Sequence, residues 1–155
     1  GTPDDLLRRL ASWLLTNAGT SQAILLKLIK KLWKRHGRED VALASILLAN
    51  IDHSVLSIEP WRIFENLIQK TEPIEGLLLC IEELLRANHQ LPSTDLYLEW
   101  LGTESINNYL AMLTCHAGMI RGVSPNKEVI KRIELVKIPS GDSILSRIKS
   151  RLTEK

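Results

Sequence analysis

The chain has 155 residues, of which 45% are hydrophobic and 25% are charged, so it is long enough to bury a continuous core and too apolar for a disordered segment. The formal net charge of +2 excludes a chain that is strongly basic or acidic as a whole. The apolar run at residues 77–81 is far shorter than the roughly 18 residues that a membrane helix needs, so we expect no membrane-spanning segment.

Hydrophobic residues recur at helical spacing along the whole chain, and no stretch alternates with the period of two that is typical of a strand. A turn is expected at residues 52–57. The pattern otherwise predicts an all-α fold with helices over residues 3–16, 21–36, 39–51, 60–69, 71–87, 95–101, 104–121, 125–136 and 142–152.

Small residues repeat along three of these helices. Ala42, Ser45 and Ala49 line one face of the third helix, and Ala111, Thr114 and Gly118 repeat that spacing in the seventh. Gly76 and Cys80 give a weaker version, so the leading positions 42, 76 and 111 lie 34 and 35 residues apart. This period predicts stacked antiparallel helical pairs, a HEAT-like α-solenoid forming a single domain over residues 1–155. The alternative is an irregular helical bundle in which small residues recur by chance.

Two blocks carry a family resemblance. Residues 32–48 contain a Leu-Trp pair, then Gly37 and the run Arg-Glu-Asp-Val-Ala-Leu-Ala-Ser-Ile-Leu-Leu, and residues 98–111 read Leu-Glu-Trp-Leu-Gly-Thr-Glu-Ser-Ile-Asn-Asn-Tyr-Leu-Ala. With residues 74–85, they resemble the HEAT-like repeats of the DNA alkylation repair (AlkD-type) glycosylase superfamily over residues 20–121. The resemblance implies an all-α superhelix whose basic concave surface cradles duplex DNA, and excision of alkylated purines without base flipping.

The catalytic motif of that family is absent. Where the family has a Trp-rich acidic stretch with its catalytic Asp, residues 70–76 read Lys-Thr-Glu-Pro-Ile-Glu-Gly, with Glu72 and Glu75 as the acids and no tryptophan. Asn-Asn-Tyr-Leu replaces the expected Trp-then-Arg signature at residues 107–110. No family catalytic residue is carried over, so we favour a non-catalytic domain. An active glycosylase would need a relocated acid.

Other chemical sites are not indicated. The four histidines are dispersed and lack the i, i+4 spacing of a helical metal pair, while Cys115 and His116 would point about 100° apart on a helix. There is no phosphate loop, dinucleotide fingerprint or Cys-x-x-Cys motif, so we expect no metal and no cofactor. We interpret Glu72, Glu75, Glu82 and Glu83 as solvated acids at helix surfaces or N-termini.

Charge is segregated along the chain. Residues 1–38 hold eight Lys/Arg against two Asp/Glu (+6), residues 39–120 hold three against twelve (−9), and residues 121–155 hold nine against four (+5). No acid interrupts residues 24–38. This stretch supplies six candidate nucleic-acid-binding residues: Lys27, Lys30, Lys31, Lys34, Arg35 and Arg38.

Three functions compete at this stage. The leading hypothesis is a binding domain that engages a nucleic-acid backbone, such as that of duplex DNA, through this basic helix. The alternatives are a protein-interaction adaptor that uses the acidic middle or a concave groove, and a repair glycosylase with a non-standard acid. A solvated lysine-rich face with no partner is the structural explanation against which the first must be tested.

The remaining residues predict packing and a reducing location. Cys80 and Cys115 lie inside apolar helical patterns and are expected to be small core residues, and Trp13, Trp33, Trp61 and Trp100 are expected to pack between helices. Because the sequence starts with polar residues, we expect no signal peptide. We therefore expect a cytoplasmic protein in a reducing environment.

Overall fold

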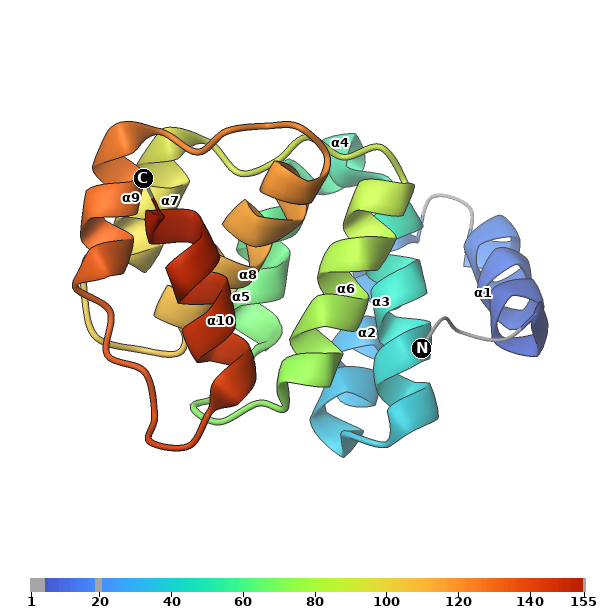
Figure 1. The fold of residues 1–155 in the computed structure, drawn as a ribbon. Helices are drawn as coiled ribbons and strands as arrows, with labels where there is room; N and C mark the ends of the chain where they lie inside the picture. Colours follow the sequence, from blue (N-terminus) through green and yellow to red (C-terminus); the bar gives the residue numbers. More distant parts are fainter. Residues whose placement is uncertain (1–4, 19–20, 155) are drawn as a thin grey trace. The chain divides into compact units, whose positions relative to one another are not determined.

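The computed structural model describes residues 5–18 and 21–154, and the regular secondary structure of these residues is entirely helical (Figure 1). The all-α prediction is therefore confirmed. The helices are α1 (Asp5–Ala18), α2 (Gln22–Arg35), α3 (Arg38–Asn50), α4 (His53–Leu56), α5 (Pro60–Leu67), α6 (Ile74–Arg86), α7 (Thr94–Trp100), α8 (Asn107–Ile120), α9 (Lys127–Glu134) and α10 (Ser143–Thr153).

Contacts within the chain divide it into two compact units, an N-terminal unit (Gly1–Gln90) and a C-terminal unit (Leu91–Lys155). In the part of the chain that the structure describes, the N-terminal unit contains α1 to α6 and the C-terminal unit contains α7 to α10. Each unit is built around one helix that is buried on nearly all sides: α3 in the first and α8 in the second.

Helix α3 forms the centre of the N-terminal unit because its small side chains let other helices approach from several directions. Every residue from Val41 to Ala49 is buried, and α1, α2 and α6 all pack against this helix. The one polar member of this run, Ser45, donates its hydroxyl to the Val41 carbonyl at 2.8 Å, which satisfies a group that would be costly to bury alone.

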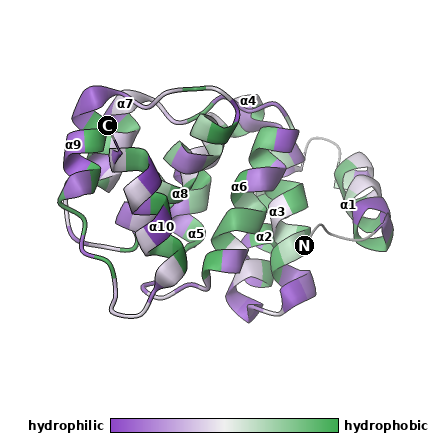
Figure 2. Cartoon of the chain, in the orientation of Figure 1, coloured by the Kyte–Doolittle hydropathy of each residue, from purple (hydrophilic) through white to green (hydrophobic). Residues whose placement is uncertain are grey.

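Helices α3 and α6 lie side by side and run in the same direction (Figure 1). Near their N-terminal ends, a Cβ atom at Gly76 would lie 3.7 Å from Val41 Cγ1. Near their C-terminal ends, the His89 ring is 2.6 Å from the Ala49 carbonyl. In Figure 2 hydrophobic residues cover much of α6 and the middle of α3, while hydrophilic residues gather around the turn between α2 and α3.

The C-terminal unit repeats the same design around α8. This helix contacts α7 and α10, and α9 packs against both of those helices. The buried Thr114 donates its hydroxyl to the Leu110 carbonyl at 2.7 Å, as Ser45 does in α3. A Cβ atom at Gly118 would lie only 2.7 Å from Leu91 Cδ1, so a larger residue at this position would require the Leu91 side chain to shift. The predicted small-residue faces of α3 and α8 are therefore confirmed as buried.

The expectation that Trp13 packs between helices is wrong. Its side chain is 61% exposed, and Leu6 and Leu10 on the same side of α1 are also exposed. In helix α1 it is Ala11 that is fully buried, and Arg8 connects the helix to α6 by donating two hydrogen bonds to the Glu83 carboxylate. The other three tryptophans are buried as predicted.

Candidate functional site

The six candidate residues all lie on the surface, and four of them share one face of α2. Lys27, Lys30, Lys31 and Lys34 are exposed, whereas Leu25, Ile29, Leu32 and Trp33 of the same helix are buried. We call the four lysines the basic face of α2. At about 1.5 Å per residue, they extend along roughly 10 Å of the helix axis.

The two arginines of the cluster have different surroundings. Arg35 Nε lies 3.5 Å from a carboxylate oxygen of Asp40 across the turn to α3, but this arginine side chain is 74% exposed and its pairing is weak. Arg38 begins α3 and lines a cavity beside Trp33. Among the described residues, no acid lies within 4.0 Å of the four lysines of the basic face.

An unneutralised lysine face of this kind suits contact with phosphates. Each ammonium is a point charge with three donors on a flexible stem, so it can follow a charged backbone without reading its sequence. The described residues place no aromatic side chain on this face for stacking on bases, because Trp33 points into the core and is 1% exposed.

The buried carboxylate of Glu72 contacts the C-terminal end of α2. Glu72 Oε2 accepts hydrogen bonds from Trp33 Nε1 at 2.8 Å and from the backbone N–H of Gln69 at 2.9 Å, and Glu72 Oε1 pairs with His36 Nε2. The Glu72 side chain is only 2% exposed. The expectation that Glu72 is a solvated surface acid is therefore wrong, and the carboxylate joins α2 to the segment before α6.

The electrostatics of this cluster favour a charged histidine. The Glu72 carboxylate raises the pKa of His36 above its ordinary value through their hydrogen bond, although partial burial opposes the shift. His36 also ends α2 in the left-handed conformation, with φ of 59°. A cavity of about 270 Å³ lies beside the cluster, walled by Val41, Gly76 and Leu79.

Glu83 is a second acid that the sequence did not mark as buried. Its side chain is 4% exposed and accepts from both terminal nitrogens of Arg8, at 3.2 and 2.8 Å. The interpretation of Glu83 as a solvated acid is wrong for the same reason as for Glu72. The side chains that bury these carboxylates, Trp33 and His36 for Glu72 and Arg8 for Glu83, lie at least 36 residues away in the sequence, where no local pattern reveals them.

Two histidines that are far apart in the sequence meet at the C-terminus of α3. The rings of His53 and His89 lie 5.1 Å apart, and their Nε2 atoms approach the carbonyls of Leu48 and Ala49. Burial lowers the pKa of His53. No group of three or more His, Cys, Asp or Glu side chains suited to a metal occurs among residues 5–18 and 21–154.

The cysteines are buried core residues, as predicted. Burial raises the pKa of the Cys80 thiol to about 12 and that of the Cys115 thiol to about 12. Thiols of this kind carry almost no thiolate near neutral pH, so they are poor nucleophiles and poor metal ligands.

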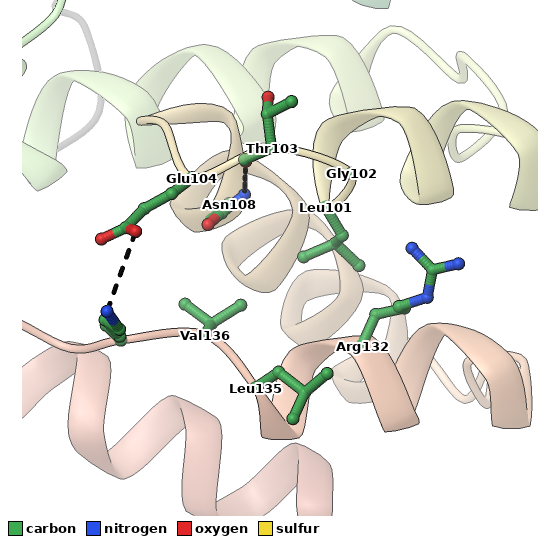
Figure 3. Close-up of a pocket in the computed structure, with 9 residues that line it drawn as sticks. Leu101, Gly102, Thr103, Glu104, Asn108, Arg132, Leu135 and Val136 are labelled. Atoms are coloured by element: carbon green, nitrogen blue, oxygen red, sulfur yellow. Dashed lines mark hydrogen bonds and ion pairs between the residues drawn. The ribbon is translucent and has the colours of Figure 1, made fainter.

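The C-terminal unit has a cavity of about 330 Å³ between the segment that joins α7 to α8 and the residues at the end of α9 (Figure 3). Leu101, Leu135 and Val136 supply apolar walls. Its polar lining residues are Thr103, Glu104, Asn108, Arg132 and Lys137. Sequence reasoning did not single out any of these residues as a site.

Comparisons with protein-family models, curated proteins and solved structures find no match to this chain. Within the described ranges, no helix has both the length and the apolar character that crossing a membrane requires. The case for a function therefore depends on the geometry of the side chains.

Proposed function

We propose that this protein is a non-catalytic binding domain that engages the phosphate backbone of duplex nucleic acid through the basic face of α2. The observation that carries the proposal is the exposure of Lys27, Lys30, Lys31 and Lys34 on one side of α2, with no acid of the described chain in ion-pair range. Neutralising phosphates releases condensed counterions, which makes such contacts favourable at low salt.

The proposed architecture is a HEAT-like stack in which α2 and α3 form one antiparallel pair and α6, which packs on α3, is the inner helix of the next repeat. Support comes from the parallel course of α3 and α6 and from the Gly76 and Val41 positions, which meet 35 residues apart in the sequence. The inner helices of neighbouring repeats in a solenoid lie parallel in the same way. This arrangement leaves α2 as an outer helix with its lysines directed to solvent.

The glycosylase alternative receives little support from the position of Glu72. Its carboxylate is buried and already accepts from Trp33, His36 and Gln69, so it stabilises the fold and is poorly placed to reach a substrate. Glu75 is exposed at the edge of the adjacent cavity, and within the described residues no hydrogen bond or ion pair holds its carboxylate in position.

A charge-reversal experiment tests the proposal. The full chain and a variant with Lys27, Lys30 and Lys34 all changed to Glu are titrated into a fluorescently labelled duplex of random sequence at about 50 mM salt, where phosphate contacts are strong. The matched control changes Lys127, Lys131 and Arg147 to Glu, three exposed cations of the C-terminal unit, so that the net charge changes equally.

We expect the affinity of the α2 variant for the duplex to be at least about tenfold lower than that of the control. Each Lys→Glu change removes a phosphate contact and also places a negative charge that repels the phosphates. Equal losses in both variants would mean that only net charge matters, and unchanged affinity in the α2 variant would remove the proposal. If the unaltered protein does not bind the duplex at all, the protein-adaptor alternative is favoured.

A further inference from the structure

The cavity of the C-terminal unit contains a side-chain amide whose orientation is fixed by the backbone. Asn108 is 7% exposed, and its Nδ2 donates to the Trp100 carbonyl at 2.7 Å and to the Thr103 carbonyl at 2.8 Å. Only the NH₂ end of an amide can donate to two carbonyls, so the positions of its oxygen and nitrogen are determined by these contacts.

The Oδ1 atom of Asn108 is consequently left as an unused acceptor. This oxygen accepts a hydrogen bond from no group of the described chain, and it remains accessible to solvent. Figure 3 shows this oxygen directed away from Thr103. Because a nine-tenths buried amide normally uses both of its ends, the free acceptor marks a place where a donor from outside can bind.

Charges of both signs border the same cavity. The Glu104 carboxylate lies on the Asn108 side, 4.0 Å from Lys137 Nζ, and both of these side chains are at least 75% exposed, so their mutual attraction is weak. Arg132 lies on the other side of the cavity (Figure 3). Its Nε is 3.5 Å from Glu128, which leaves the two terminal nitrogens available as donors.

Apolar side chains occupy the space between these two polar regions. Leu101 lies between Asn108 and Arg132 in Figure 3, Val136 also lines the cavity, and Leu135 adds a wall that is 78% exposed. The cavity therefore offers the Asn108 and Glu104 acceptors beside the Lys137 ammonium at one end, the Arg132 donors at the other and an apolar middle. A ligand that satisfies all three regions carries an ammonium and an anionic group joined by an apolar spacer.

We propose that this cavity binds a small elongated zwitterion, with its ammonium on Asn108 Oδ1 and the Glu104 carboxylate and its carboxylate on the Arg132 guanidinium. The spacer packs on Leu101 and Val136. This site is independent of the basic face of α2, because all of its residues belong to the C-terminal unit.

The probe that tests this site is 6-aminohexanoate, titrated into the isotope-labelled full chain while backbone amide shifts are recorded by NMR. We expect saturable shifts at Glu104, Asn108 and Arg132, with a dissociation constant of about 1 mM. Hexylamine and hexanoate each lack one charged end and are expected to bind at least about tenfold more weakly, since one charge-assisted contact is lost. Glycine has no spacer and is expected to give no saturable shift.

Arg132→Leu is the matching variant, because this exposed side chain can be replaced without opening the core. It is expected to weaken 6-aminohexanoate binding by about tenfold, whereas Arg147→Leu in the same unit leaves it unchanged. The absence of saturation below about 10 mM, equal binding of hexylamine, or unaltered affinity in Arg132→Leu would overturn the proposal.

Discussion

The indole Nε1 of Trp33 donates a 2.8 Å hydrogen bond to the buried carboxylate of Glu72, although 39 residues separate the two in the sequence. This bond joins the last turn of α2 to the segment that leads into α6. The same carboxylate holds His36, the residue that ends α2. The basic face of α2 therefore belongs to a helix whose C-terminal end is fixed by a charged, buried cluster.

Replacing Glu72 by Gln should lower the free energy of unfolding by about 1–3 kcal/mol, because it leaves His36 without its anion and weakens the bond from Trp33. Urea denaturation followed by tryptophan fluorescence measures the change. Glu75→Gln removes an exposed carboxylate three residues further along the chain and should stay within about 0.5 kcal/mol of the unaltered protein. Similar losses in the two variants would contradict a structural role for Glu72.

The pKa of His36 is raised above 6.5 in the folded protein, which gives its pairing with Glu72 a definite pH dependence. Because the folded state binds this proton more tightly than the unfolded state, the stabilisation is fully present below pH 6.5 and is lost as pH rises through the folded-state pKa. His36→Asn tests this, since Asn tolerates the left-handed backbone found at this position. The stability difference between the two proteins should shrink as pH rises, and a difference that is constant with pH would refute the pairing.

Two glycines should respond differently to substitution by alanine. Gly76 lies inside α6, and its added Cβ would make an ordinary 3.7 Å contact with Val41, so Gly76→Ala should stabilise the protein by about 0.5–1 kcal/mol through helix propensity. At Gly118 the Cβ would lie 2.7 Å from Leu91 Cδ1, which must move. Gly118→Ala should therefore be neutral or destabilising. Thermal denaturation of both variants measures the two changes in stability. A larger gain in stability at Gly118 would contradict the close contact between Gly118 and Leu91.

The contact between Arg8 and Glu83 predicts that an ion pair helps to hold α1 against α6. Arg8→Met leaves the Glu83 carboxylate buried with only Arg86, 3.9 Å away, as a charged neighbour, so it should cost about 1–3 kcal/mol of unfolding free energy. Arg9→Met, a change of the exposed neighbouring residue, should cost little. The double variant Arg8→Met with Glu83→Gln should recover part of the loss, because no buried charge then remains unpaired. Strictly additive losses would count against the pairing.

The sequence predicts the local features of this fold well, because helix boundaries depend on neighbouring residues. Ser93, Asn126 and Asp142 accept from backbone N–H groups at the starts of α7, α9 and α10, and the predicted helices begin close to these caps. The one-turn helix α4 lies where a turn was expected, and its N-cap Asp52 makes the same kind of bond. Each of these helix starts is determined by a side chain and a backbone N–H group two or three residues apart.

The long-range features could not be predicted in this way. Nothing near Glu72 or Glu83 in the sequence indicates that Trp33 or Arg8 will bury it, since a helix periodicity gives the direction of a side chain relative to its own helix only. The outward position of Trp13 has the same origin: its stripe is apolar, but the face of α1 that packs is decided by Ala11 and by the Arg8 contact. The fixed amide of Asn108 depends on a turn geometry between α7 and α8 that no motif encodes.

The proposal of nucleic-acid binding is tested most directly by the salt dependence of binding to duplex DNA. Four phosphate contacts predict a slope of log K against log salt of about −3.5, and changing Lys27, Lys30 and Lys34 to Gln should bring it to about −1. The matched control, with Lys127, Lys131 and Arg147 changed to Gln, should keep the original slope. A slope that is the same in all three proteins would show that the basic face of α2 does not contact the DNA backbone.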